Sequence, residues 1–290
     1  MIPAQFEYHA PQTLPKALRL LAEHKENAKL LAGGQSLVPT MKLRLAAPGV
    51  LIDLSRVGAL SYVTQKDDHF AIGAMATHYM IESARAVPRK CALLEQVASH
   101  IGDVQVRNRG TIGGSLVHAD PAADWPAAML ALDAELKLTS ARGERAVKYA
   151  DFVKGLFTTV IEPDEILTEI KVPYFAPRTG SAYLKVEQPA SGFALCGIAA
   201  MLTMNEQGFC QDARVSITGV ASQQFRAHGV ENALKGQTLS PEAIANASTK
   251  ASEGVSNPFE DIHASGEYRL HLVRTYTQRA LMEALSKLVA

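Results

Sequence analysis

The chain has 290 residues, 47% of them hydrophobic, and its 29 Lys and Arg residues balance its 29 Asp and Glu residues. This length allows about two domains with a substantial buried core. The charge balance argues against a surface built to bind nucleic acid or an anionic membrane.

No uninterrupted apolar run approaches the roughly 20 residues of a membrane-spanning helix, and the first residues lack a basic segment followed by an apolar one. We therefore expect a cytoplasmic protein with no membrane span. The three cysteines, Cys91, Cys196 and Cys210, are far apart and form no CxxC pair. Any iron–sulfur centre that works with this protein is therefore expected on another chain.

Strands and helices alternate in the first part of the chain. Thr13 is expected to cap a helix that carries Leu14, Leu18 and Leu21, and Ser36 a short helix that carries Leu37, Met41 and Leu45. Strands are predicted at residues 6–8, 28–31 and 50–54. This order is typical of a compact α/β subdomain.

The next segment is expected to be mixed. A hairpin is predicted from strands at 61–63 and 69–72, followed by a helix capped by Thr77 and one that runs from Pro88 through Ala98. Asp124 stands where a cap or first-turn acid of a helix at 125–132 belongs. Further strands are predicted at 134–139, 146–149 and 165–172, with a short helix near Asp151.

Pro173 and Pro177 indicate a domain boundary. Beyond them, strands at 181–187, 194–204 and 213–221 predict an antiparallel meander, followed by helices near 231–235, after Ser240, and over 273–288. The predicted fold class is α+β: a two-subdomain α/β domain at 1–176 (about 1–57 and 58–176), then an antiparallel three-stranded sheet with helices at 177–290.

Two glycine-rich stretches stand out. In residues 29–37 a strand runs into Gly33-Gly34, and successive N–H groups at such a turn can bind an anion such as a diphosphate; an ordinary strand-to-helix turn is the alternative. Residues 105–124 contain three more glycines, two hydroxyls, a histidine and two aspartates. Both stretches together could hold one elongated ligand, such as a dinucleotide. Neither is a GxxxxGK[ST] loop or a GxGxxG turn, which argues against a phosphate loop and against plain nicotinamide binding.

Two other kinds of site are weakly supported. His118, Asp120 and Asp124 provide one imidazole and two hard carboxylates, a poor zinc site, so no metal site is expected. A hydrolase triad with Ser36 and His118 lacks the GxSxG elbow around the serine, so no hydrolase triad is expected in this chain.

Residues 31–39 (LAGGQSLVP) and 107–124 (RNRGTIGGSLVHADPAAD) resemble the two FAD signatures of the flavoprotein medium subunits of molybdenum hydroxylases, the family of carbon monoxide dehydrogenase and quinoline oxidoreductase. Residues 261–265 and 267–269 also resemble the C-terminal domain of that family, so the resemblance spans nearly the whole chain. It implies that residues 1–176 form the FAD-binding domain.

The resemblance also implies a set of residues around a non-covalently bound FAD. The backbone of the first stretch would wrap the diphosphate, the second would follow the diphosphate and ribityl chain, Asp124 would accept a hydrogen bond from a cofactor hydroxyl, and Leu167 and Lys185 would approach the isoalloxazine. The complete set is Lys29, Leu30, Leu31, Ala32, Gly33, Gly34, Gln35, Ser36, Leu37, Ile101, Gly102, Thr111, Gly114, Ser115, His118, Asp120, Asp124, Leu167 and Lys185.

Its partners follow from the same resemblance: a large molybdopterin subunit, a small [2Fe–2S] subunit, assembly as a dimer of heterotrimers, and an external electron acceptor. The chain would be the electron-transfer subunit of this oxidoreductase. The segment Val186–Phe193 departs from the family, whose members often carry a basic run and an aspartate there, so the acceptor stays open. The alternatives are a stand-alone flavin oxidase or reductase and a non-catalytic nucleotide-binding regulator.

Overall fold

The computed structural model describes residues 2–288, which divide into two compact units. The first unit comprises Met1–Ala84, Asp103–Ala119 and Ala134–Val172, and the second comprises Arg85–Gly102, Asp120–Asp133 and Pro173–Ala290. The second glycine-rich stretch is therefore shared: its helical part belongs to the first unit and Asp120–Asp124 to the second. Among residues 2–288, no helix is both long and apolar enough to cross a membrane.

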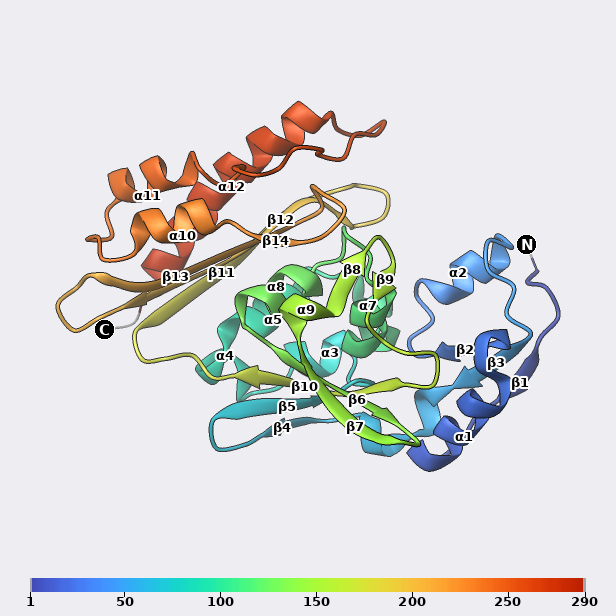
Figure 1. Cartoon of the computed structure of the whole chain (residues 1–290). Coiled ribbons are helices and arrows are strands. Elements are labelled where there is room, and N and C mark those ends of the chain that lie inside the picture. Colours follow the sequence, from blue (N-terminus) through green and yellow to red (C-terminus); the bar gives the residue numbers. More distant parts are fainter. Residues whose placement is uncertain (1, 289–290) are drawn as a thin grey trace. The chain divides into compact units, whose positions relative to one another are not determined.

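The first unit begins with a parallel three-stranded sheet in the order β1-β3-β2 (Figure 1). Its strands are β1 (Glu7–His9), β2 (Ala28–Leu31) and β3 (Val50–Asp53). Helix α1 (Leu14–His24) buries Leu18 and Leu21 against this sheet, and the Thr13 hydroxyl accepts a hydrogen bond from the Lys16 N–H at 3.4 Å. The predicted cap and strand β2 are confirmed.

The short helix after the first glycine pair differs from the prediction. Helix α2 (Leu37–Lys42) ends before Leu45, which is 78% exposed, and Arg44 adopts a positive φ of 59° where the chain leaves the helix. Ser36 stands at the N-cap position, but its backbone is helical and its hydroxyl makes no capping hydrogen bond. An N-cap residue normally needs an extended backbone to aim its oxygen at the following N–H groups.

A five-stranded sheet in the order β4-β5-β10-β6-β7 forms the rest of the core of the first unit. Its strands are β4 (Val63–Gln65), β5 (His69–Gly73), β6 (Glu135–Ser140), β7 (Gly143–Lys148) and β10 (Ile166–Pro173). The other elements of this unit are α3 (His78–Glu82), α6 (Val104–Arg109), α7 (Ile112–His118), α9 (Tyr149–Phe152), the hairpin β8 (Val153–Gly155) and β9 (Thr158–Thr159), and 3-10 turns at Lys25–Asn27, Leu54–Arg56 and Gly58–Leu60.

The second unit is built on an antiparallel sheet in the order β11-β12-β13-β14 (Figure 1). Its strands are β11 (Thr179–Glu187), β12 (Ala194–Met204), β13 (Cys210–Thr218) and β14 (Phe225–Arg226). The predicted meander is confirmed, and β14 extends it by two residues. The helices are α4 (Val87–Lys90), α5 (Ala92–Ser99), α8 (Trp125–Ala131), α10 (His228–Leu234), α11 (Pro241–Ser248) and α12 (Gly266–Ser286).

Both faces of this sheet are covered. Helices α10, α11 and α12 cover one face, whose residues include Ala182, Ile198 and Val215, and α5 and α8 pack on the other (Figure 1). The long apolar run of β12 follows from this arrangement, because a strand buried on both faces needs no polar alternation. The side chains of Tyr183 and Lys185 project from the face that α5 and α8 cover, because residues two apart on a strand share a face.

The single helix predicted from Pro88 through Ala98 is wrong. Cys91 separates α4 from α5 with a non-helical backbone (φ −160°, ψ 72°). The thiol of Cys91 is fully buried, as are Leu93, Leu94 and Val97. The break orients α5 so that these four buried side chains face the core. This orientation is set by tertiary packing, which the 3.6-residue spacing of apolar residues does not predict.

Candidate functional site

The two glycine-rich stretches touch each other within the first unit. A Cβ placed on Gly33 would lie 2.3 Å from the carbonyl oxygen of Arg109 and 2.6 Å from the Cα of Gly110. A Cβ on Gly114 would lie 3.3 Å from the Cβ of Ala32. The backbones approach so closely that only glycine fits at Gly33, so the two stretches lie side by side within this unit.

The first stretch presents backbone donors that nothing in the described part of the chain uses. Gly34 has a positive φ of 74°, which turns the chain sharply between β2 and α2. Within residues 2–288, the N–H groups of Gly33, Gly34, Gln35 and Ser36 donate no hydrogen bond. These residues are exposed or half-buried. A run of accessible, unpartnered N–H groups at a glycine turn is a site for an anion with several oxygens.

The N–H groups at the glycine turn of the second stretch already donate hydrogen bonds within the first unit. The Thr111 hydroxyl caps α7 by accepting from the Gly114 N–H at 3.1 Å, while the Ile112 N–H donates to Ala76 O at 3.0 Å and the Gly113 N–H to Ala74 O at 2.9 Å. A Cβ on Gly113 would lie 2.5 Å from Ala74 O. The second stretch therefore supports the first by close packing, and it does not add a second run of free donors.

The other predicted residues of the first unit lie on the flanks of this turn or away from it. Gln35 Nε2 donates to Gly33 O at 3.4 Å and so stays close to its own turn. The His118 ring ends α7 and packs against the ring of Phe157, with centroids 5.1 Å apart. Leu167 is a buried residue of β10 paired with Leu138 of β6. Half-buried Leu30, Leu31, Ala32, Leu37 and Ser115 and exposed Lys29 complete this set.

His78 lies beside the second glycine turn and is 4% exposed. A Cβ on Gly110 would lie 2.7 Å from its Nε2, and the His78 N–H donates to Gly110 O at 3.0 Å. Burial, followed by the charge of Arg107, lowers the pKa of His78 from 6.5 to about 4. A neutral imidazole therefore supports the turn at physiological pH.

In the second unit, Asp124 is engaged by β11 and does not cap its helix. Its backbone is helical and its carboxylate makes no capping hydrogen bond to α8. Instead, Oδ1 accepts from the hydroxyl of Tyr183 at 2.5 Å and lies 3.1 Å from the ammonium of Lys185. Burial raises the pKa of Asp124, and the Lys185 charge and the Tyr183 hydrogen bond oppose that rise. Asp124 thus stands at the predicted N-cap position of α8, but its side chain does not cap the helix, because two long-range partners hold it.

Lys185 is almost completely buried. Its side chain is 1% exposed, and its Nζ donates to His100 O and to Gly192 O, both at 2.7 Å, besides contacting both oxygens of Asp124. Burial and the neighbouring Asp124 charge raise the pKa of Tyr183 well above its usual value, so its hydroxyl stays protonated and donates. The result is a buried, mutually satisfied cluster of Asp124, Tyr183 and Lys185.

The remaining predicted residues of the second unit are Ile101, Gly102 and Asp120, which lie near His100 or Asp124 in the sequence. Ile101 and Gly102 follow His100 directly, and Gly102 has a positive φ of 48°. The Asp120 carboxylate accepts from the Ala122 N–H at 2.9 Å, which shapes the chain on its way to Asp124. Among the predicted residues, the second unit thus joins Asp124 and Lys185 directly and places Gly102 two residues after the His100 carbonyl that Lys185 contacts.

Sequence reasoning missed Tyr183 and the carbonyl groups of His100 and Gly192. The spacing of Tyr183 and Lys185 on a predicted strand indicates that both side chains share a face, which was the available signal for the tyrosine. No sequence pattern reveals that carbonyls 85 and 7 residues from Lys185 accept from its ammonium.

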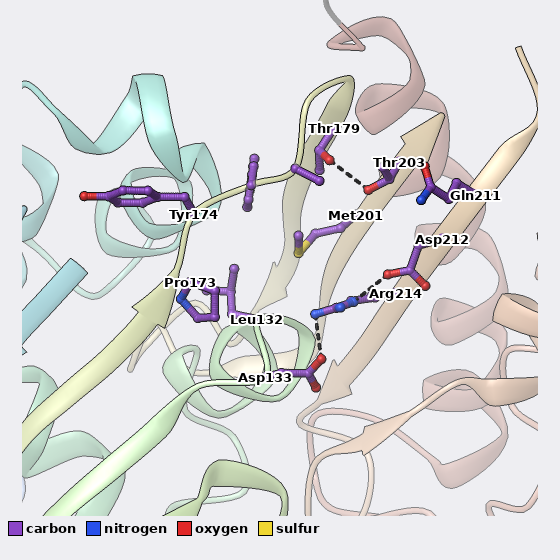
Figure 2. Close-up of a pocket in the computed structure, with 12 residues that line it drawn as sticks. Leu132, Asp133, Pro173, Tyr174, Thr179, Met201, Thr203, Gln211, Asp212 and Arg214 are labelled. Atoms are coloured by element: carbon purple, nitrogen blue, oxygen red, sulfur yellow. Dashed lines mark hydrogen bonds and ion pairs between the residues drawn. The ribbon is translucent and has the colours of Figure 1, made fainter. Parts of the chain in front are cut away.

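A separate cavity of about 280 Å³ lies elsewhere in the second unit, and none of the predicted residues lines it (Figure 2). On its wall, Arg214 is held between Asp133, at 2.7 Å, and Asp212, at 2.8 Å. Thr179 and Thr203 are joined by a hydrogen bond of 2.8 Å. In the β11–β12 register, Thr179 lies six residues from Lys185, so this cavity and the Lys185 cluster are at different ends of the sheet.

The fold is of mixed α and β structure and its glycine turn offers a site for an anion with several oxygens. Comparisons with known proteins identify the family. Residues 4–175 match the FAD binding domain in molybdopterin dehydrogenase, and residues 181–284 match the CO dehydrogenase flavoprotein C-terminal domain. The chain is 36% identical to the carbon monoxide dehydrogenase medium chain of Hydrogenophaga pseudoflava, over 99% of both chains. It is 37% identical to 6-hydroxypseudooxynicotine dehydrogenase complex subunit alpha of Paenarthrobacter nicotinovorans, over 99% of this chain and 97% of that one.

Solved structures agree with these sequence relatives. A chain of carbon monoxide dehydrogenase from H. pseudoflava superposes with a TM-score of 0.95 at 37% identity over 100% of both chains. A chain of quinoline 2-oxidoreductase from Pseudomonas putida 86 superposes with a TM-score of 0.92 at 34% identity over 99% of both. The chain therefore belongs to the FAD-binding medium subunits of the molybdenum hydroxylases, and its α+β fold is that of the carbon monoxide dehydrogenase medium subunit. It is an oxidoreductase subunit whose cofactor is FAD.

Proposed function

We propose that this chain passes electrons from the [2Fe–2S] clusters of a small subunit to an external acceptor, within a heterotrimer whose large subunit carries molybdopterin and hydroxylates the substrate. Bound FAD supplies the redox chemistry of this subunit. The task of the polypeptide is to hold that cofactor, shield it and set its surroundings. The proposed higher assembly is a dimer of heterotrimers.

The observation that supports FAD retention most strongly is the run of unpartnered N–H groups at residues 33–36. A diphosphate carries negative charge on several oxygens, and hydrogen bonds to charged groups are about twice as strong as neutral ones. We propose that the backbone of Lys29–Leu37 holds the diphosphate, with the side chains of Gln35 and Ser36 adding donors. Thr111, Gly114, Ser115 and His118 follow the diphosphate and ribityl chain in this proposal; because the N–H groups of Gly114 and Ser115 already donate to Thr111, Gly114 contributes only by leaving room for the cofactor.

In the second unit, we propose that Ile101, Gly102 and Lys185 contribute to the surroundings of the isoalloxazine, and that Asp120 and Asp124 contribute to cofactor binding. For the first unit, we propose that Leu167 also contributes to cofactor binding. A lone pair on Asp124 is compatible with one further donor, because a carboxylate has about four acceptor sites and the described partners of Asp124 are Tyr183 and Lys185. The three cysteines are free buried thiols, which suits the reducing cytoplasm that we propose as the location.

The test is purification of the complex from its native source by a tag on this chain. Two further subunits, one with molybdopterin and one with iron–sulfur clusters, would support the proposal, as would acceptor reduction that stops when this chain is stripped of FAD. Turnover of an organic substrate by this chain alone would favour the stand-alone flavin oxidase or reductase instead. FAD binding without reduction by the partner subunits would favour the regulator.

A further inference from the structure

Lys185 joins three separate segments of the second unit. Its ammonium contacts His100 at the end of α5, Asp124 at the start of α8, and Gly192 in the β11–β12 loop. A lysine ammonium has three donor hydrogens, and these three partners account for all of them. Its side chain is 1% exposed, so it has no remaining donor to direct at a ligand.

Two of these segments pack against each other. A Cβ on Gly192 would lie 3.6 Å from the Cα of Gly102, which shows that the β11–β12 loop lies on the residues just after α5. Gly192 and Gly102 both have positive φ, 71° and 48°, so both segments turn sharply at their point of contact. The Lys185 ammonium bonds the carbonyl of Gly192 on one side and the carbonyl two residues before Gly102 on the other.

The rest of the cluster fixes the ammonium in place. Tyr183 donates to Asp124 at 2.5 Å, and its ring packs edge-on to the ring of His100 with centroids 5.7 Å apart. The Lys185 charge also suits the carbonyl end of α5, where the helix dipole is negative. The loop itself is compact, since the N–H groups of Ser191 and Gly192 donate to Gln188 O at 3.2 and 2.8 Å.

We propose that Lys185 is a positioning residue, whose ammonium fixes the Gln188–Phe193 loop against Ile101–Gly102 and acts on bound FAD through these segments, without a contact of its own. This inference rests on the proposed function, which assigns Ile101 and Gly102 to the flavin surroundings. It makes the proposed contribution of Lys185 to the isoalloxazine surroundings an indirect one, in place of direct action of its charge on the flavin. The two roles differ because direct action needs an available charge, whereas the Lys185 charge is paired with Asp124.

The test begins in the FAD-free full-length chain, so that it does not depend on flavin binding. Lys185→Met should raise amide hydrogen exchange of residues 100–103 and 188–193 about tenfold or more, while residues 196–202 in the middle of β12 stay protected. Lys250→Met, at an exposed lysine of the same unit, is the matched control and should change neither segment. Unchanged exchange in both segments of Lys185→Met would overturn the proposal.

Lys185→Met alone leaves the Asp124 carboxylate buried without its cation and can unfold the chain. The double variant Asp124→Asn/Lys185→Met removes both charges and keeps a partner for the Tyr183 hydroxyl. It should fold and show the same fast exchange, because the His100 and Gly192 carbonyls still lack their donor. Protection equal to that of the unmodified chain in the double variant would also overturn the proposal.

The reduction potential of bound FAD separates positioning from direct action. If Lys185 acted directly on the flavin, Lys185→Met and Asp124→Asn would move the potential in opposite directions, since one removes a positive and the other a negative charge. Positioning predicts that both variants loosen the two segments and move the potential in the same direction. Opposite shifts with unchanged exchange would overturn the proposal. Failure of the unmodified chain to bind FAD would refute the proposed function and leave the exchange result as a separate test.

Discussion

Substituting Gly33 by alanine should separate the two glycine-rich stretches and release FAD. The new Cβ would lie 2.3 Å from Arg109 O and 2.6 Å from Gly110 Cα, so one backbone must move by about 1 Å or more to reach ordinary van der Waals contact. No rotamer change can relieve this clash, because both neighbours are backbone atoms. Overpacking of this kind costs about 1–3 kcal/mol.

The effect on FAD binding should exceed the effect on stability. Displacing the turn misaligns several N–H donors at once, and each hydrogen bond to a charged group contributes about 1.5–3 kcal/mol. Losing one or two of these hydrogen bonds should raise the Kd for FAD by about 100-fold, which corresponds to about 2.7 kcal/mol of binding free energy. Titration of FAD-free protein, followed by quenching of flavin fluorescence, measures this Kd directly.

Gly58→Ala is the matched control in the same unit, because a Cβ there would meet no atom within 4 Å. It should keep the Kd of the unmodified chain. Thermal unfolding of both FAD-free variants separates loss of binding from loss of folding. A Gly33→Ala chain that folds and binds FAD with an unchanged Kd would refute the reasoning about the turn.

Three further predictions concern the residues around the site. The pKa of His78 is lowered to about 4 in the folded chain, so its contribution to stability is complete above the unfolded-state pKa of 6.5 and is lost as the pH falls toward 4. The titration of His78 should therefore lower the free energy of unfolding by about 2 kcal/mol between pH 8 and pH 5. The variant His78→Gln should lack this part of the pH dependence, as measured by urea unfolding at both pH values. Thr111→Val deletes the cap of α7 and should cost about 1 kcal/mol in the same assay, whereas Thr64→Val on half-buried β4 should cost little. Tyr183→Phe removes a donor from Asp124, so it should lower stability by about 1–3 kcal/mol and raise the pKa of that carboxyl further, which carbon NMR of labelled aspartate would follow.

Local chemistry made part of the fold predictable. Thr13 before an apolar helical pattern and the short apolar segment that leads into the Gly33-Gly34 turn each carry their own signal, and both elements form where expected. The meander of the second unit was predictable because its strands follow one another with short turns. Helix α7 was not predicted, because Gly113 and Gly114 disfavour helix. Gly113 is required by its close approach to Ala74, a residue far away in the sequence.

The candidate site likewise has one part that the local sequence predicts and one part that it does not. The anion-binding character of Gly33-Gly34 follows from local sequence, since a glycine turn after a strand exposes successive N–H groups. The roles of Asp124 and Lys185 do not, because their pairing joins residues 61 apart. The local sequence favours a capping hydrogen bond from the Asp124 side chain. The buried Lys185 ammonium and the Tyr183 hydroxyl bind that side chain instead, so tertiary contacts override the local preference.

The central claim is that this chain retains FAD through the glycine turn. Its most direct test is the flavin content of the purified full-length chain, from the absorbance of the cofactor released on denaturation and its identification as FAD or FMN by chromatography. The account predicts about one FAD for each chain, with uptake restored when stripped protein is given FAD. A colourless chain that takes up no added FAD, or one that retains FMN instead, would contradict it.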